Sequence, residues 1–157
     1  MGMLHKNNTE KEWIEKLSDH YDFQQRWKAE EELAAMGVAV IPSLIETLQD
    51  IDRRVSAANV LVRIGKASID PLINCLADPD WRVRFISANA LGKLKAVEAV
   101  DILINLLHDP RPEVRQYSAE ALGMIGDRRA LQPLKNRLQS EDSMLAIRGI
   151  EEALRYF

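Results

Sequence analysis

The side chains best suited to bind a metal ion or attack a substrate are few and scattered in this chain. There are three histidines, His5, His20 and His108, and one cysteine, Cys75. None of the histidines lies three or four residues from a cluster of Cys, Asp or Glu, the spacing that puts ligands on one helix face. No serine stands in a nucleophile-elbow context. We therefore predict no metal site, no cofactor and no catalytic residue, and we interpret Cys75 as a small buried hydrophobe.

A second set with evident chemistry is a row of arginines. They recur 28, 30 and 31 residues apart, at Arg26, Arg54, Arg84 and Arg115. Guanidinium groups spaced by one structural repeat could bind a series of phosphates. Acidic turn residues lie close to them, however, at Asp50, Asp78, Asp80 and Asp109. We favour ion pairs between repeats and leave these arginines out of the predicted binding site.

The arginines belong to an internal repeat with two leucine series. Seven residues after each arginine comes a leucine, at Leu33, Leu61, Leu91 and Leu122. The second series comprises Leu44, Leu72, Leu103 and Leu134, each followed four residues later by another leucine. Steps of three, four and seven residues put side chains on one helix face, so each repeat predicts two helices. Such a pair buries its apolar faces only by stacking on its neighbours.

Helix ends are marked by turn-forming residues. Gly37, Gly65 and Gly126 follow the first helix of a pair, where a positive φ often ends a helix. Asp-Pro pairs at 78–79 and 109–110 mark the turns between pairs, because the residue before proline avoids the helical region. Capping boxes fit Thr9 with Glu12 and Asp22 with Gln25.

These signals predict an all-α protein, since no segment alternates with the period of a strand. We expect a right-handed α-solenoid of about four to five helix pairs. The predicted parts of this single structural domain are an N-terminal segment and capping helix (1–21), four repeats (22–139) and a C-terminal capping helix (140–157). The leading helix is expected at about 9–17 and the last at about 141–156.

The segment VRQYSAEALGMIGDRRALQPLKNRL, residues 114–138, has weaker copies around Val83 and Arg54. It resembles the HEAT-like repeats first recognised in phycobilisome lyase subunits, and the resemblance covers about residues 26–138. Two departures stand out. Lys95 replaces the expected glycine, and two residues are missing between Leu48 and Leu61, where we expect a tighter turn.

In stacks that resemble this one the second helices line a concave surface, so their non-core positions form the predicted partner-binding site. One such position carries asparagine in three repeats, and a row of amides offers donors and acceptors to an extended partner. Solvation or bonding between helices is the alternative. We name the set the polar stripe: Glu46, Asp70, Asn74, Asp101, Asn105, His108, Gln132, Asn136 and Gln139.

Other expectations concern the surroundings of the polar stripe. The stripe is acidic at Glu46, Asp70 and Asp101, and basic residues follow nearer the C-terminus. This change of charge predicts a partner of mixed charge. The basic residues are Arg128, Arg129, Lys135 and Arg137. We interpret Trp81 and Tyr117 as packing residues and expect Gln116 to face outward.

Composition narrows the class of function. The net charge of −3 and the sequence pI near 5.7 argue against nucleic-acid binding. The first residues lack a signal peptide, and no apolar run reaches the ~20 residues of a membrane span, so we expect a cytoplasmic protein. The predicted function is a non-catalytic protein–protein interaction scaffold or adaptor. The alternatives are a subunit of a bilin lyase/isomerase-type complex and a nucleic-acid-binding HEAT-like module.

Overall fold

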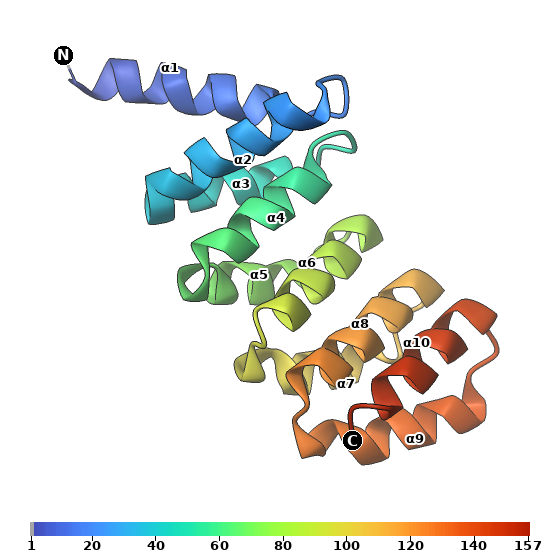
Figure 1. The fold of residues 1–157 in the computed structure, drawn as a ribbon. Helices are drawn as coiled ribbons and strands as arrows, with labels where there is room; N and C mark the ends of the chain where they lie inside the picture. Colours follow the sequence, from blue (N-terminus) through green and yellow to red (C-terminus); the bar gives the residue numbers. More distant parts are fainter. Residues whose placement is uncertain (1) are drawn as a thin grey trace. The chain divides into compact units, whose positions relative to one another are not determined.

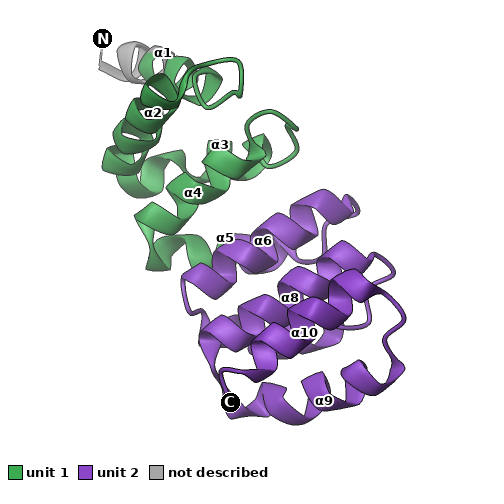
Figure 2. Cartoon of the chain, turned by 45° about the vertical axis from the view of Figure 1, so that its right-hand side comes forward, with its two compact units in different colours: residues 1–71 green, residues 72–157 purple. Residues whose placement is uncertain are grey.

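The computed structural model describes the backbone of residues 2–157 and the side chains of residues 9–157. Throughout that part of the chain the regular secondary structure is helical (Figure 1). The predicted all-α class is therefore confirmed. The chain divides into two compact units, residues 1–71 and 72–157 (Figure 2).

The first unit begins with a leading helix and continues with the first pairs. Its helices are α1 (Gly2–Glu15), α2 (Phe23–Met36), α3 (Ile41–Thr47) and α4 (Arg54–Ile64), and α5 (Ile69–Cys75) crosses the boundary of the two units. Short 3-10 helices, η1 (Gly37–Val40) and η2 (Lys66–Ser68), lead into α3 and α5. Helix α2 packs on α1 and α4, and α3 packs on α4.

The second unit is built in the same way. Its helices are α6 (Trp81–Lys93), α7 (Val100–Leu106), α8 (Pro112–Ile125), α9 (Leu131–Ser140) and α10 (Met144–Leu154), with η3 (Val97–Ala99) and η4 (Arg128–Ala130) before α7 and α9. Helix α8 lies between α6 and α10, α7 packs on α8, and α9 packs on α10 (Figure 1). By residue number, the predicted repeats (22–139) contain α2 and α3, α4 and α5, α6 and α7, and α8 and α9.

Both leucine series form the core. The leucines that follow the arginines by seven residues are all fully buried, at Leu33, Leu61, Leu91 and Leu122. Those that begin the second series are fully buried too, at Leu44, Leu72, Leu103 and Leu134. Burying a leucine side chain contributes about 1.5–3 kcal/mol, so this register accounts for much of the stability of each repeat.

Helix boundaries differ from the prediction at both ends of the chain. Helix α1 begins at Gly2, so Thr9 lies inside it and forms no N-cap. The second predicted capping box is confirmed: the Gln25 N–H donates to Asp22 Oδ1 at 2.8 Å, and the Asp22 N–H donates to Gln25 Oε1 at 3.3 Å. The last helix begins only at Met144, and residues 141–143 belong to no helix.

The two missing residues between Leu48 and Leu61 do not tighten a turn. Helix α4 begins at the repeating arginine itself, Arg54, whereas α6 begins three residues before Arg84. The deletion is therefore taken up by a shorter helix. Ile51, which would lie in the missing turn of helix, is instead 68% exposed.

Two glycines let the first helices of the second unit approach closely. A Cβ added at Gly123 of α8 would lie 2.7 Å from the Cα atom of Ala153 in α10. A Cβ at Gly149 would lie 2.8 Å from Cγ of Gln116. Gln116 is therefore half-buried between α8 and α10, and the prediction that it faces outward is wrong.

Candidate functional site

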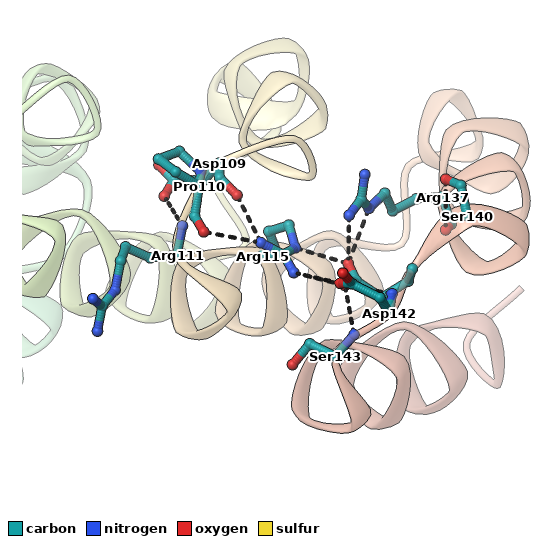
Figure 3. A network of polar contacts seen from close by, with 9 residues as sticks. Asp109, Pro110, Arg111, Arg115, Arg137, Ser140, Asp142 and Ser143 are labelled. Carbon is teal, nitrogen blue, oxygen red and sulfur yellow. Dashed lines mark hydrogen bonds and ion pairs between the residues drawn. The ribbon is translucent and has the colours of Figure 1, made fainter.

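The repeating arginines of the second unit join successive repeats. Arg115 donates from Nε and Nη2 to the Glu141 carboxylate at 2.8 and 2.6 Å, and from Nη1 to the Asp109 carbonyl at 2.9 Å (Figure 3). Arg84 makes the same arrangement one repeat earlier, with Nε and Nη2 at 2.8 and 3.0 Å from the Asp109 carboxylate and Nη1 at 2.8 Å from the Asp78 carbonyl. Ion pairing between repeats is confirmed for these two arginines.

Glu141 is the centre of the larger network. Its side chain is fully buried and also accepts hydrogen bonds from Arg137 Nε at 2.9 Å and from the Ser143 N–H at 3.0 Å (Figure 3). Burial by itself raises the pKa of this carboxyl group, but the hydrogen bonds from Arg115 and Arg137 outweigh burial and hold the pKa of Glu141 far below its ordinary value. The carboxylate is ionised at neutral pH and serves the fold.

The arginines of the first unit are also held locally. Arg26 donates to Asp19 Oδ1 at 3.1 Å and to the Tyr21 carbonyl at 3.3 Å. Arg54 donates to the carbonyls of Gln49 and Asp50 at 3.2 and 3.3 Å. Guanidinium groups engaged in this way are not arranged as a row of phosphate ligands.

The residues with catalytic or metal-binding potential stay apart. No group of three or more His, Cys, Asp or Glu in the described residues could hold a metal ion. His5 lies outside the residues whose side chains are described, and Nδ1 of His20 is 2.7 Å from the Ser18 hydroxyl. Cys75 is buried, and burial raises the pKa of its thiol, which favours the unreactive protonated form.

All nine residues of the polar stripe are exposed. In the second unit, Asp101 and Asn105 project from α7, and Gln132 and Asn136 occupy the corresponding positions of α9. Asn74 has the same repeat position in α5. His108 lies three residues after Asn105, and Gln139 lies three residues after Asn136.

Helices α7 and α9 are linked through polar groups. The Arg129 guanidinium, in η4 just before α9, lies 2.9 Å from Asp101 Oδ1 of α7 and 2.9 Å from Asp127 Oδ2. The hydrogen bond between Arg129 and Asp127 lowers the pKa of Asp127 and raises that of Arg129. Within α9, Gln132 Nε2 donates to Asn136 Oδ1 at 2.8 Å. The stripe therefore contains some of the internal bonding that the alternative interpretation expects.

The basic end of the stripe is smaller than the sequence suggests. Arg129 is paired with Asp101, and Arg137 is paired with Glu141 at 2.9 Å. Arg128 and Lys135 are exposed and make no ion pair with the residues that the structure describes.

In the first unit the polar stripe residue Glu46 lines a cleft of about 460 Å³ between α1 and α3. Its other lining residues include Glu10, Lys11 and Ile14 of α1 and Ser43 of α3. This cleft could not be predicted from the sequence, because nothing in the repeat pattern shows that the leading helix lies beside α3.

Comparison with protein families decides the classification. The family model for HEAT repeats matches residues 69–155, more than half of the chain. The chain belongs to the HEAT-repeat family. A second model, the PBS lyase HEAT-like repeat, matches residues 53–78. The resemblance predicted from residues 114–138 is thereby confirmed.

Solved structures support the HEAT-repeat fold. One similar structure is the complex of CpcE and CpcF of phycocyanin lyase from Nostoc sp. PCC7120, with a TM-score of 0.65 and 19% identity, covering 84% of this chain and 90% of that chain. Another is an engineered protein, with a TM-score of 0.56 and 19% identity, covering 94% of this chain and 78% of that chain. No curated protein matches the sequence. Among the described residues, no helix has both the length and the apolar character needed to cross a bilayer.

Proposed function

We propose that this HEAT-repeat chain is a non-catalytic scaffold or adaptor that binds a protein partner along the polar stripe. The observation that carries the proposal is the asparagine at one position of α5, α7 and α9, exposed in each helix. A row of side-chain amides offers both donors and acceptors to the backbone groups of an extended segment. We place the protein in the cytoplasm.

The hydrogen-bonding capacity of the asparagines supports this use. Asn136 accepts one bond from Gln132, which leaves its NH₂ group for a partner. Asn74 and Asn105 make no hydrogen bond through their side chains to the described residues. A scaffold needs no ionisable group in a catalytic environment, and the strongly perturbed carboxyl group, Glu141, is fully buried in the fold.

The test begins with affinity capture from the source cell, which supplies the partner. The triple variant Asn74→Ala, Asn105→Ala and Asn136→Ala should then bind that partner at least about tenfold more weakly, because each lost hydrogen bond costs about 0.5–1.5 kcal/mol. Helicity should be unchanged, since alanine favours helix and all three side chains are exposed. Titration calorimetry measures the affinity.

The matched control is Glu151→Ala, an exposed position of α10 that is not in the stripe. Gln116→Ala is unsuitable, because Gln116 packs against Gly149. Equal affinities of the wild type and the triple variant would reject the polar stripe as the interface.

A second candidate is a subunit of a bilin lyase/isomerase-type complex. It is supported by the fold similarity to a chain of the phycocyanin lyase complex and by the PBS lyase HEAT-like repeat match. An open-chain tetrapyrrole would give the captured complex a visible absorption band. A colourless complex with an unpigmented partner favours the adaptor, and salt-sensitive retardation of nucleic acid would favour the third possibility.

A further inference from the structure

Three aromatic rings form a continuous stack on the first helices of the second unit. Trp81 and Phe85 of α6 have ring centroids 5.6 Å apart, and Phe85 and Tyr117 of α8 have centroids 5.0 Å apart. The Arg111 guanidinium covers Trp81 at 4.3 Å. Counted from the repeating arginine, the rings occupy positions −3 and +1 of one repeat and +2 of the next. Each ring is thereby partly covered, and none of the three is among the strongly exposed apolar residues.

The first unit has the same arrangement with one ring missing. Positions −3 and +1 of α2 are Phe23 and Trp27, whose centroids lie 6.1 Å apart in a stacked geometry. Position +2 of the following first helix, α4, is Ser56 rather than tyrosine. Phe23 is 70% exposed and Trp27 is 46% exposed. This aromatic pair therefore lacks the third ring, which Tyr117 supplies in the second unit.

A cavity lies where the third ring is missing. It has a volume of about 230 Å³ and is bordered by Phe23 and Trp27 of α2 and by Val55, Ser56 and Asn59 of α4. Sites for whole small molecules are roughly 300–1,000 Å³, so this cavity suits one side chain better than a cofactor. The Arg63 guanidinium covers Trp27 at 4.3 Å but is not part of the cavity lining.

The lining of the cavity includes a carboxylate where the other repeats have alanine. Glu30, also in the lining, stands at position +4, where the other repeats have Ala58, Ala88 and Ala119. Its side chain is only 11% exposed and is held by two long contacts, from Asn59 Nδ2 at 3.4 Å and Arg63 Nη1 at 3.8 Å. A carboxylate has about four acceptor sites, so Glu30 can accept a further short hydrogen bond.

We propose that this cavity, which we name the α2–α4 aromatic groove, binds a tyrosine side chain of a protein partner, and that Ser56 leaves room for it. The incoming ring stacks on Trp27 as Tyr117 stacks on Phe85, and its hydroxyl donates to Glu30. A short, charge-assisted O–H···O⁻ bond of this kind distinguishes tyrosine from phenylalanine. The groove lies on first helices and so is a surface distinct from the polar stripe.

Charge indicates the residues beside that tyrosine. Residues 1–71 contain nine Lys and Arg against twelve Asp and Glu, a net charge of −3. Asp19, in the lining of the groove, has a 76% exposed side chain although it pairs with Arg26 at 3.1 Å. Glu31, beside Glu30, has a 56% exposed side chain and only a long contact of 4.0 Å to Arg63. A tyrosine flanked by basic residues therefore fits this surface best.

The experiment uses the full chain and three peptides, acetyl-Lys-Tyr-Lys-amide and its forms with phenylalanine or alanine in the centre. Indole N–H signals in ¹H–¹⁵N NMR spectra report on Trp13, Trp27 and Trp81 separately. We expect the tyrosine peptide to shift the Trp27 signal saturably and to leave that of Trp81 unchanged. The phenylalanine peptide should bind more weakly, and the alanine peptide should give no saturable shift.

Variants test the geometry. Ser56→Tyr supplies the third ring within the chain and should abolish the shift, whereas Ser56→Ala should keep it. Phe23→Ala, at a largely exposed position that tolerates substitution, should weaken binding roughly twofold to tenfold. No saturable shift at Trp27, an equal shift with the alanine peptide, or undiminished binding to Phe23→Ala would overturn the proposal. Equal affinities for the tyrosine and phenylalanine peptides would overturn the role of Glu30.

Discussion

The guanidinium of Arg115 and the carboxylate of Glu141 form a two-point ion pair across 26 residues of sequence. The Glu141 side chain is fully buried and that of Arg115 is 9% exposed. The pair ties α8 to the segment that precedes α10, and Arg84 with Asp109 ties α6 to the segment that precedes α8. Each arginine thus holds the start of the next first helix.

Removing the Glu141 charge should be costly. Glu141→Gln removes the fully buried anion that pairs with the buried Arg115 and the partly exposed Arg137, and leaves Arg115 only the exposed Asp142 at 3.6 Å. Breaking one side of a buried pair typically costs about 3–5 kcal/mol. Urea unfolding followed by circular dichroism measures the loss. The matched control is Glu152→Gln, which breaks an exposed pair with Arg155 and should cost less than about 1 kcal/mol. Similar losses for the two variants would contradict a structural role for the buried pair.

The ion pair of Glu141 with Arg115 should also make the stability of the protein depend on pH. Because the pKa of Glu141 is depressed in the folded state relative to about 4.3 in the unfolded chain, its stabilisation is complete above pH ~5 and is lost as the pH falls toward the folded-state pKa. The free energy of unfolding of the wild type should therefore fall more steeply below pH ~5 than that of Glu141→Gln. Urea titrations at several pH values between 7 and 3 give the two curves. Parallel curves would show that the carboxyl is not perturbed.

The repeat pattern predicted the helix pairs but not this network. Leu91 and Leu122 could be assigned to the core because helical periodicity depends only on spacing along the chain. Glu141 could not, since it lacks the Asp-Pro context of Asp109 and was expected inside a helix. Its partner is fixed by how α8 and α10 pack, which spacing along the sequence does not determine.

Of the two candidate binding surfaces, one could be predicted from the sequence and the other could not. That the polar stripe is exposed could be predicted, because the stripe residues alternate with buried leucines such as Leu103 and Leu134. The groove at Trp27 and Ser56 could not, because it depends on a missing ring in one repeat and on the ring of Tyr117 in another. Aligning aromatic positions between repeats, rather than leucines alone, is the signal that could have found it.

Because α8 and α10 pack closely at Gly123, even an alanine at this position should destabilise the protein. In Gly123→Ala the new Cβ would meet the Ala153 Cα at 2.7 Å, so the backbone of α10 must shift. Overpacking of this kind costs about 1–3 kcal/mol. Differential scanning calorimetry should show a lower Tm. Adding Ala153→Gly should restore only part of the lost Tm, because the Cα atom of residue 153 remains in place. Full recovery of the Tm would show that the clash is with the Ala153 methyl group instead.

A truncation in the middle of the core tests the register of the repeats. Leu91 is fully buried in α6, and Leu91→Ala should destabilise the protein by about 2–5 kcal/mol through lost burial and a cavity. Ile102→Ala is the aliphatic control, because Ile102 is 37% exposed in α7 and should cost much less. Chemical unfolding of both variants gives the comparison. An unchanged stability for Leu91→Ala is incompatible with the observed packing.

The last prediction concerns the ends of the first helices, where one repeat has a lysine in place of glycine. Lys95 has φ 51°, and Gly126, its counterpart in the next repeat, has φ 72° with ψ 20°. A residue with a Cβ pays roughly 1–2 kcal/mol in this left-handed region, whereas glycine loses more unfolded-state entropy, about 0.5–1 kcal/mol. The first effect is larger, so Lys95→Gly should raise the stability slightly and Gly126→Lys should lower it.

Gly65 ends a first helix in a different backbone conformation from that of Gly126. Its φ of 86° is combined with ψ of −138°, a region that is essentially limited to glycine, whereas Gly126 lies where lysine is tolerated, as Lys95 itself demonstrates. Gly65→Ala should therefore destabilise the protein more than Gly126→Ala, although an added Cβ would meet nothing within 4 Å at Gly65 and would lie 3.9 Å from the Gly123 carbonyl oxygen at Gly126. Thermal unfolding of the variants at one pH gives the order Lys95→Gly, wild type, Gly126→Ala, Gly65→Ala from most to least stable. Any order in which Gly65→Ala is the milder of the two alanine substitutions would show that backbone conformation does not govern these helix ends.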